Sequence, residues 1–162
     1  VATFERGNIL TEIEDKSSYD YAITQRCLIN LQTDDEKIDA FKNIVNSLRP
    51  GGSYIMVESS IDPLIKTNKV RKELGLPEIK EPWHNKFFTR DLIENLRNLK
   101  IAELVDEINI TSTYYFMSRI IYAKLAMDSG EELKYDSEIN KLAKLMPITG
   151  DFGPVKLWIW QK

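Results

Sequence analysis

The sequence predicts an α/β fold whose sheet is mostly parallel. An apolar, strand-like run over 18–24 ends in polar residues, and a helix pattern follows over 34–48. Pro50-Gly51-Gly52 then closes this helix and opens a second apolar run over 53–58. A strand, a helix and a second strand in this order form a βαβ crossover, which places the two strands parallel in one sheet.

The helix of this crossover has clear boundaries at both ends. Thr33 is followed three residues later by Glu36, which is the spacing of a capping box, and an acidic first turn suits the helix dipole. Pro50 cannot continue the helix, and the two glycines that follow allow a tight return into the next strand. One apolar stripe recurs at steps of three and four residues and can lie on the sheet, formed by Ile38, Phe41, Ile44, Val45 and Leu48.

Further strands and helices are predicted on both sides of this crossover along the chain. Residues 2–6 resemble a strand that precedes the crossover, and residues 155–160 resemble a final strand. We expect a weaker strand within 100–110, because its apolar and polar residues alternate only in part. Helices are predicted over 62–74, after Thr89, over 113–127 and over 137–145.

Size, charge and cysteine content exclude several classes of protein. A chain of 162 residues suits a single domain, and a net charge of -3 gives no basic face for nucleic acid. No apolar run approaches the roughly 18 residues of a membrane span. One cysteine excludes an internal disulfide, which fits a reducing compartment. We expect one cytoplasmic domain over 1–162 with no nucleic-acid or membrane partner and no metal site.

Polar residues follow both strands of the crossover. Thr24, Gln25 and Arg26 end the first apolar run, and Glu58 and Ser59 end the second. In open parallel sheets ligands bind beyond the carboxyl ends of the strands. The sequence therefore predicts the functional site at this edge.

The order and spacing of four motifs carry a resemblance to a known family. They are Gly7-Asn8-Ile9-Leu10, the run from Tyr19 to Leu31, the helix ending Leu48-Arg-Pro-Gly-Gly52, and the strand ending at Glu58. Together they resemble the later two thirds of a class I S-adenosylmethionine-dependent methyltransferase. The resemblance implies a Rossmann-like sheet in which 2–6, 19–24 and 53–58 are the third, fourth and fifth strands. It also implies a sixth strand near 100–110 and an antiparallel seventh at 155–161.

The resemblance further implies that part of the domain precedes Val1. Family members hold the cofactor with a glycine-rich loop and an acidic residue on the first two strands, and no G-x-G occurs in this chain. We therefore expect the C-terminal part of a methyltransferase domain that is truncated at the N-terminus and inactive by itself. The segment 1–6 would then be frayed, pair with 20–24, or complete its sheet with a second polypeptide. An unpaired edge of this kind also favours self-association.

The resemblance implies which residues would contact S-adenosyl-L-methionine. Asn8 would bond the adenine amino group and Ile9 would flank the ring, although Gly-Asn is also an ordinary turn pair. Thr24, Gln25 and Arg26 would meet the methionyl end and the reacting methyl group. Packing or a surface salt bridge is the alternative role for Gln25 and Arg26.

Candidate catalytic residues follow from the chemistry of the acceptor. His84 is the single histidine and titrates near neutral pH, which suits a base for an oxygen or nitrogen nucleophile. Glu58 could orient or deprotonate the acceptor, or it could cap the next helix. Trp83 and Asn85 flank His84 in a loop rich in proline and aromatic residues, which is typical of a lid or substrate wall.

A second group of candidates lies further along the chain. Tyr114, Tyr115 and Arg119 could line the acceptor pocket within a substrate-side helical insertion over 111–147. Arg119 would suit a carboxylate or phosphate on the substrate. Aromatic residues at helical spacing are also common in protein cores, so packing is the alternative.

The resemblance implies methyl transfer from S-adenosyl-L-methionine to a small-molecule or sugar-like acceptor in the intact protein. One alternative is a non-catalytic methyltransferase-like module that mediates protein association. Another is a different nucleotide-binding α/β protein such as a dehydrogenase. That class would not ordinarily join the Leu-Arg-Pro-Gly-Gly turn to a strand ending in Glu.

Overall fold

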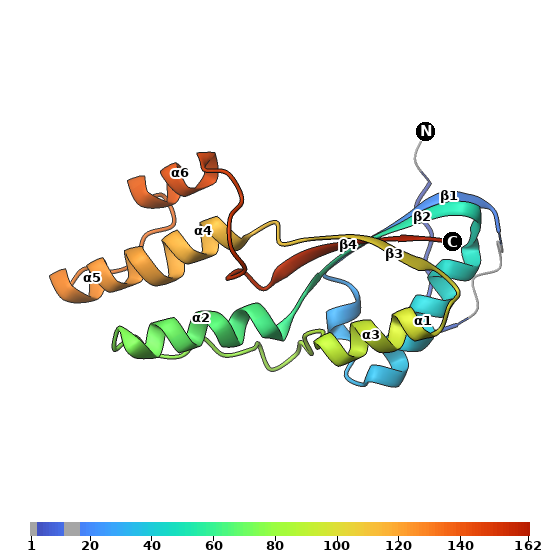
Figure 1. Cartoon of the computed structure of the whole chain (residues 1–162), viewed down its shortest axis with the longest axis horizontal. Coiled ribbons are helices and arrows are strands. Elements are labelled where there is room, and N and C mark those ends of the chain that lie inside the picture. Colours follow the sequence, from blue (N-terminus) through green and yellow to red (C-terminus); the bar gives the residue numbers. More distant parts are fainter. Residues whose placement is uncertain (1–2, 12–16) are drawn as a thin grey trace.

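A computed structural model describes residues 3–11 and 17–162 and shows a mixed α/β architecture around a four-stranded sheet (Figure 1). Strands β1 and β2 run parallel, while β4 lies between β2 and β3 and runs antiparallel to both. In spatial order the strands are β1 (Tyr19–Gln25), β2 (Leu48–Ser59), β4 (Val155–Gln161) and β3 (Glu103–Ile108). The predicted Rossmann-like sheet with an antiparallel last strand is confirmed.

The register of β1 against β2 brings the two predicted polar ends to one edge. Thr24 lies opposite Met56 and Gln25 lies opposite Val57, so both strands finish side by side. Helix α1 (Asp34–Ser47) makes the crossover between them. The predicted parallel pairing is therefore confirmed.

The capping box that begins α1 is present. The Thr33 hydroxyl accepts a hydrogen bond from the Glu36 backbone N–H at 3.2 Å, and the Glu36 carboxylate accepts one from the Thr33 N–H at 3.1 Å. Near its start β2 makes an irregularity at Pro50-Gly51-Gly52, where its register against β1 shifts, and both glycines are required there. Gly51 has a φ of +80°, and a Cβ on Gly52 would lie 3.1 Å from the Asp20 carbonyl oxygen.

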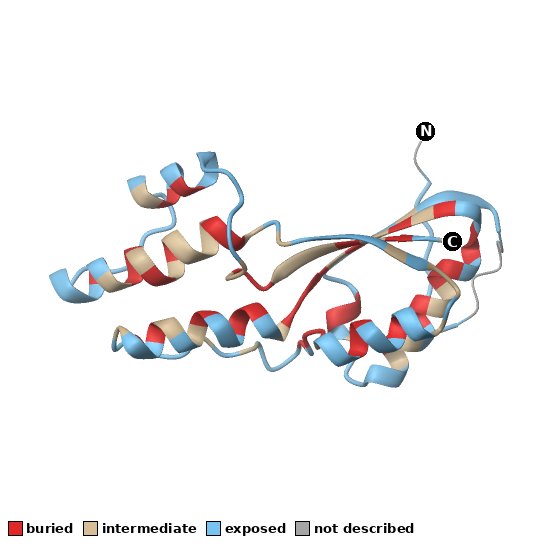
Figure 2. Ribbon diagram, viewed as in Figure 1, coloured by how far each residue is buried: buried red, intermediate tan, exposed pale blue. Residues whose placement is uncertain are grey.

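One face of the sheet carries the buried core. Helices α1 and α3 (Arg90–Asn98) lie on this side of the strands (Figure 1), and their buried residues appear red in Figure 2. The Phe41 ring of α1 packs edge-on against Trp160 at 4.9 Å between centroids. The Phe88 ring packs against Trp158 in a tilted arrangement at 6.0 Å between centroids, so aromatic contacts join helix, loop and sheet.

Beyond the carboxyl edge of the sheet, two helical segments extend away from the strands (Figure 1). The first is α2 (Ile61–Glu73), which follows β2 directly. The second, which we call the helical arm (residues 111–147), contains α4 (Ser112–Phe116), a π-helical stretch (Met117–Tyr122), α5 (Ala123–Ser129) and α6 (Glu138–Leu145). The guanidinium of Arg71 on α2 bonds the Arg119 carbonyl, which joins the two segments.

The predicted strand over 2–6 is wrong for the part that is described. Residues 3–6 form no strand and are exposed, with Phe4 94% accessible, and residues 1 and 2 lie outside the described residues. The direct pairing of this segment with 20–24 is therefore also not found for 3–6. A strand needs a partner ladder and a buried face, and these residues have neither.

None of the helices in the described ranges is long and apolar enough to cross a membrane.

Candidate functional site

Glu58 is fully buried at the carboxyl end of β2 and holds the segment that follows β1. Its carboxylate accepts hydrogen bonds from the backbone N–H groups of Cys27, Leu28 and Ile29 at 3.1, 3.0 and 3.2 Å. Burial raises the pKa of the Glu58 carboxyl, although these donors act in the opposite direction. Both oxygens are thus engaged with the backbone, in a capping role for a short 3₁₀ turn at Leu28–Asn30.

Thr24 faces the core side of the sheet rather than solvent. Its hydroxyl shares a hydrogen bond of 2.7 Å with the Tyr54 hydroxyl, and Thr24 is buried. Burial raises the pKa of Tyr54 far above its ordinary value, so this phenol stays neutral. This hydrogen bond fixes the C-terminal end of β1 against β2.

Gln25 and Arg26, in contrast, are exposed where β1 ends. The Arg26 N–H still donates to the Val57 carbonyl at 2.8 Å, which extends the parallel ladder by one residue. Arg26 has a φ of +50°, a left-handed conformation that is uncommon outside glycine and is concentrated at functional positions. The two side chains are therefore free to contact a ligand at this edge.

Cys27 lies between these residues and the 3₁₀ turn. Partial desolvation and the nearby Glu58 carboxylate raise the pKa of its thiol, so the thiol stays protonated at neutral pH. This argues against Cys27 as a nucleophile.

The loop over 82–88, which we call the docked loop, packs against the segment after β1. Asn85 donates to the Asn30 side chain at 3.1 Å, and the Gln32 side chain donates to the His84 carbonyl at 3.0 Å. The Lys86 N–H donates to the Ile29 carbonyl at 2.7 Å. These bonds bring the predicted His84 and Asn85 beside the end of β1.

Side chains of the docked loop differ in exposure. The Trp83 side chain is 92% exposed, and its ring packs edge-on against the exposed His84 at 5.3 Å. Asn85 is buried, and within the described part of the chain its Oδ1 has no hydrogen-bond partner. A buried acceptor without a partner is a group that a ligand hydroxyl or amine can satisfy.

Asn8 and Ile9 lie against α1. The Asn8 side chain accepts from the Leu10 N–H at 3.1 Å, and the Ile9 carbonyl accepts from Asn43 of α1 at 3.0 Å. The segment thus forms a local turn, which is the alternative that the sequence left open. In the described residues no hydrogen bond joins it to the site at the end of β1.

Tyr114, Tyr115 and Arg119 lie on the helical arm. Tyr115 is partly buried against the core, and burial raises the pKa of its hydroxyl. The Arg119 guanidinium lies 5.6 Å from the centroid of the Tyr135 ring. Tyr114 lines an apolar groove of about 430 Å³ between α4 and α6. Among the described residues these three therefore contact Arg71 of α2, the core, Tyr135 and the surroundings of α6.

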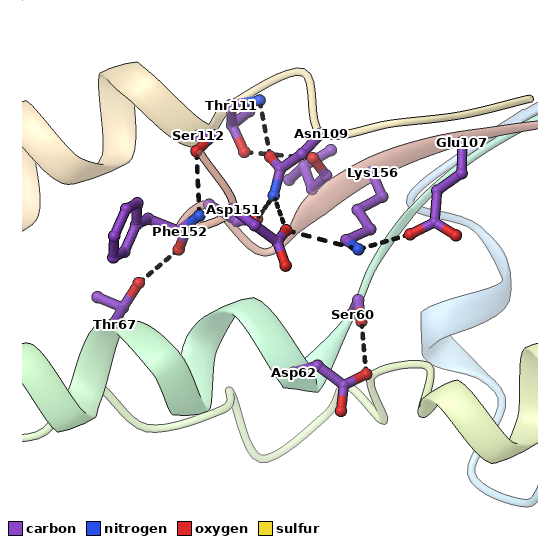
Figure 3. Close-up of polar contacts among 12 residues, drawn as sticks. Ser60, Asp62, Thr67, Glu107, Asn109, Thr111, Ser112, Asp151, Phe152 and Lys156 are labelled. Atoms are coloured by element: carbon purple, nitrogen blue, oxygen red, sulfur yellow. Dashed lines mark hydrogen bonds and ion pairs between the residues drawn. The ribbon is translucent and has the colours of Figure 1, made fainter. Parts of the chain in front are cut away.

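A polar cluster that the sequence analysis missed lies at the ends of β3 and β4 (Figure 3). Lys156 contacts the carboxylates of Glu107 at 2.6 Å and Asp151 at 3.5 Å, and Asn109 donates to Asp151 at 2.7 Å. The cluster borders a cavity of about 370 Å³ between α3 and the sheet. The one feature of the sequence that pointed to this cluster was Lys156, a charged residue within the apolar final strand. The described residues contain no group of three His, Cys, Asp or Glu placed to bind a metal ion.

Comparisons with known proteins identify the fold. No protein-family model and no curated protein matches the sequence. Among solved structures, the chain is similar to a SAM-dependent methyltransferase, possible histamine N-methyltransferase, from Thermotoga maritima, with a TM-score of 0.56, 14% identity and 96% of this chain covered. It is also similar to geranyl diphosphate C-methyltransferase from Streptomyces coelicolor A3(2), solved with S-adenosyl-L-homocysteine, with a TM-score of 0.53, 10% identity and 97% covered. A third is the cyclase SpnF, with a TM-score of 0.54, 18% identity and 98% covered.

The chain has the class I methyltransferase fold. It spans 62%, 53% and 55% of these three solved structures, so each of them contains a large part that has no counterpart here. The presence of a cyclase among them shows that the methyltransferase fold alone does not determine the reaction.

The carboxyl edge of β1 carries exposed polar side chains that have the chemistry to bind an anionic group. Exposed Gln25 and Arg26 lie at the carboxyl edge of β1, where a carboxylate could be bound by a charge-assisted hydrogen bond. The described residues offer no glycine-rich turn beside β1, and Asn8 is engaged in its own turn.

Proposed function

We propose that the intact protein transfers a methyl group from S-adenosyl-L-methionine to a small-molecule or sugar-like acceptor. The observation that supports this most is the parallel pair β1 and β2, whose adjacent carboxyl ends are joined through Glu58 to the segment 27–29. In the class I fold this edge is the expected ligand site.

In this proposal the exposed end of β1 binds the cofactor. Arg26 pairs with the methionyl carboxylate, and Gln25 adds a hydrogen bond to the same end of the molecule. Thr24 fixes the strand end through Tyr54, and Glu58 acts as a positioning residue for the N–H groups of the following turn. Asn8 and Ile9 would contact the adenine only if their turn moved away from α1.

The docked loop would form the acceptor side. His84 is exposed beside Trp83 and can accept a proton from a hydroxyl or amine acceptor, and Asn85 offers its unpaired Oδ1 to the same group. Tyr114, Tyr115 and Arg119 would form the outer wall on the helical arm. The cofactor, when bound, supplies an electrophilic methyl group. The residues of this chain align the acceptor and exclude water, which are large contributions to such a transfer.

A non-catalytic association module is the second candidate. It is favoured by the exposed apolar residues Tyr21 and Ile23 on β1, which lie next to the candidate site. Such a module would keep the fold without binding the cofactor.

Titration calorimetry of S-adenosyl-L-methionine separates the two candidates. It should be carried out on the chain preceded by any residues that its reading frame encodes upstream of Val1. We expect binding that weakens roughly tenfold or more in Arg26→Ala, because a charge-assisted hydrogen bond is lost. Arg97→Ala, an exposed arginine paired with Glu94 on α3, is the matched control and should bind normally. Absence of heat at high cofactor concentration would favour the association module.

A further inference from the structure

Arg71 on α2 is a buried arginine whose positive charge is not balanced by a carboxylate. The residue is only 7% exposed. Its Nε donates to the Pro77 carbonyl at 2.8 Å, and its guanidinium also donates to the Arg119 carbonyl on the helical arm. Both acceptors are neutral, and no carboxylate within 3–11 and 17–162 forms an ion pair with Arg71. An arginine is rarely buried without a paired anion, because an uncompensated buried charge is costly.

A second guanidinium lies close to the first. Arg119 is half-buried, and its one printed side-chain contact in the described part of the chain is with the Tyr135 ring. Burial lowers the pKa of Arg71, and the positive charge of Arg119 lowers it further. Like charges at short range repel each other unless an anion compensates them. Two planar guanidinium groups in one place are also typical of sites that bind a carboxylate or phosphate.

Tyr115 adds a hydroxyl donor to this pair of arginines. Burial raises the pKa of Tyr115, while the charges of Arg119 and Arg71 act in the opposite direction, so the three polar groups lie in one region. The raised pKa keeps the phenol protonated at neutral pH, as a hydrogen-bond donor. Among the described residues this hydroxyl has no hydrogen-bond partner, although the ring packs against the core. Packed tyrosines usually find a partner for the hydroxyl, so this donor is available to a ligand.

The surroundings of this cluster carry an excess of positive charge. Helix α2 contains four basic residues and two acidic residues, although the chain as a whole has a net charge of -3. The basic residues are Lys66, Lys69, Arg71 and Lys72, and the acidic residues are Asp62 and Glu73. A concentration of one sign of charge attracts ligands of the opposite sign and speeds their association. Helix α2 therefore favours an anion at this place.

We propose that Arg71, Arg119 and Tyr115 bind a carboxylate or phosphate group of the methyl acceptor. The contact between Arg71 and the Arg119 carbonyl joins α2 to the helical arm, and both segments extend from the carboxyl edge of the sheet (Figure 1). The site thus lies beyond the edge at which the cofactor is proposed to bind. This inference rests on the proposed function and specifies its substrate class, an anionic small molecule.

Thermal unfolding of the chain in different salts tests this site without the cofactor. The midpoint is measured at pH 7 in phosphate, succinate and chloride of equal ionic strength, over a series of anion concentrations. We expect phosphate or succinate to raise the midpoint above that in chloride, with the saturation of a single site. The anion that does so, phosphate or the dicarboxylate, identifies the group that the acceptor carries.

Two variants show whether the response comes from this cluster. Tyr115→Phe keeps the ring and removes a hydroxyl that has no partner in the described chain, so the midpoint in chloride should not change. Its apparent anion affinity should fall roughly fivefold to tenfold, and that of Arg119→Gln roughly tenfold or more, because each loses a hydrogen bond to a charged group. Tyr21→Phe on β1 and Arg97→Gln on α3 are the matched controls and should keep the full response.

Three results would overturn the proposal. Equal midpoints in the three salts would show that Arg71 only fastens α2 to the helical arm. A response that Tyr115→Phe and Arg119→Gln leave unchanged would place the anion elsewhere on the protein. An anion response of this cluster in a protein that gives no calorimetric heat with S-adenosyl-L-methionine would keep the anion site but reject its role in binding an acceptor, so failure of the site and failure of the proposed function give different results. If Arg119→Gln fails to fold, Tyr115→Phe provides the decisive measurement.

Discussion

At the residue scale, Glu58 determines the shape of the candidate site more than any exposed side chain. Its carboxylate binds three consecutive backbone N–H groups, which fixes the turn that separates Arg26 from the docked loop. A buried carboxylate is costly unless donors surround it, and here the donors come from a segment about thirty residues away. The site therefore depends on a tertiary contact between the two strand ends.

Glu58→Gln tests this contact. The amide keeps the shape of the side chain but replaces one acceptor oxygen with an NH₂ group that opposes a backbone N–H. We expect a loss of about 1–3 kcal/mol in the free energy of unfolding, measured by urea titration. Glu107→Gln, a partly exposed carboxylate at the far edge of the sheet, should change stability by less than about 0.5 kcal/mol. Equal effects in the two variants would contradict the capping role.

Lys37 gives a second prediction, one that depends on pH. Its side chain is fully buried, donates to the Lys86 carbonyl at 2.7 Å and lies 4.9 Å from the centroid of the Phe88 ring. Burial lowers the pKa of Lys37, so between that lowered value and 10.5 the unfolded chain is protonated and the folded chain is not.

Stability should therefore rise as pH increases through this window. The unfolded state binds the extra proton, so raising the pH disfavours it relative to the folded state. Free energies of unfolding measured by urea at several alkaline pH values should show the rise in the native chain and a smaller rise in Lys37→Met. Lys42→Met, an exposed lysine on the same helix, should keep it. An unchanged slope in Lys37→Met would show that Lys37 is not the group responsible.

These residues also show which part of the site the sequence could predict. Gln25, Arg26 and His84 were expected near one edge from strand order and loop composition alone, and the structure brings these segments together. The capping role of Glu58 toward 27–29 was not predicted, because the pairing depends on which backbone groups the fold brings within hydrogen-bond distance. Lys156 stands out as a charge within an apolar strand, but its cluster was missed because only the fold brings its partners Glu107 and Asp151 to it.

At the element scale, a helix or strand could be predicted from the sequence where residues at its own ends mark its boundaries. The capping box before α1 was predicted and is present. The strand expected over 53–58 begins earlier, at Leu48, so Pro50-Gly51-Gly52 lies inside β2, where the register against β1 shifts, rather than before it. The strand expected over 2–6 was wrong because strand formation is decided by neighbours rather than by the apolar composition of the segment. The π-helical stretch at Met117–Tyr122 also has no sequence signal that distinguishes it from an α-helix.

The helical arm should open more readily than the sheet. On α6 the buried residues are Asn140 and Ala143, whereas Leu142 and Leu145 are exposed, so little apolar area holds this helix in place. We expect amide hydrogens of 123–145 to exchange well before those of β2, as measured by hydrogen-deuterium exchange with mass spectrometry. Protection of the arm equal to that of β2 would contradict this and would indicate a rigid arm.

At the scale of the whole molecule, the sheet divides the chain into a packed side and an unpacked side. Phe41, Trp158 and Trp160 are almost entirely buried on one face, while Ile23 on the other is two-thirds exposed. Hydrophobic burial on one face alone contributes less stability than the two-sided burial for which the strand pattern is suited. Residues 1–162 should therefore behave as a folded unit with an accessible apolar surface.

Binding of 1-anilinonaphthalene-8-sulfonate to the native chain measures that surface. The dye should fluoresce with residues 1–162. Ile23→Lys should lower the signal by at least about half, because the charge interrupts the apolar row that Ile23, Ile55 and Ile159 form on the sheet face opposite the core. Leu145→Lys introduces the same charge on α6 and should leave the signal unchanged. Both variants should keep the native circular dichroism spectrum, since both side chains are largely exposed. If Leu145→Lys lowers the signal and Ile23→Lys does not, the accessible surface lies on the helical arm and the sheet is already covered.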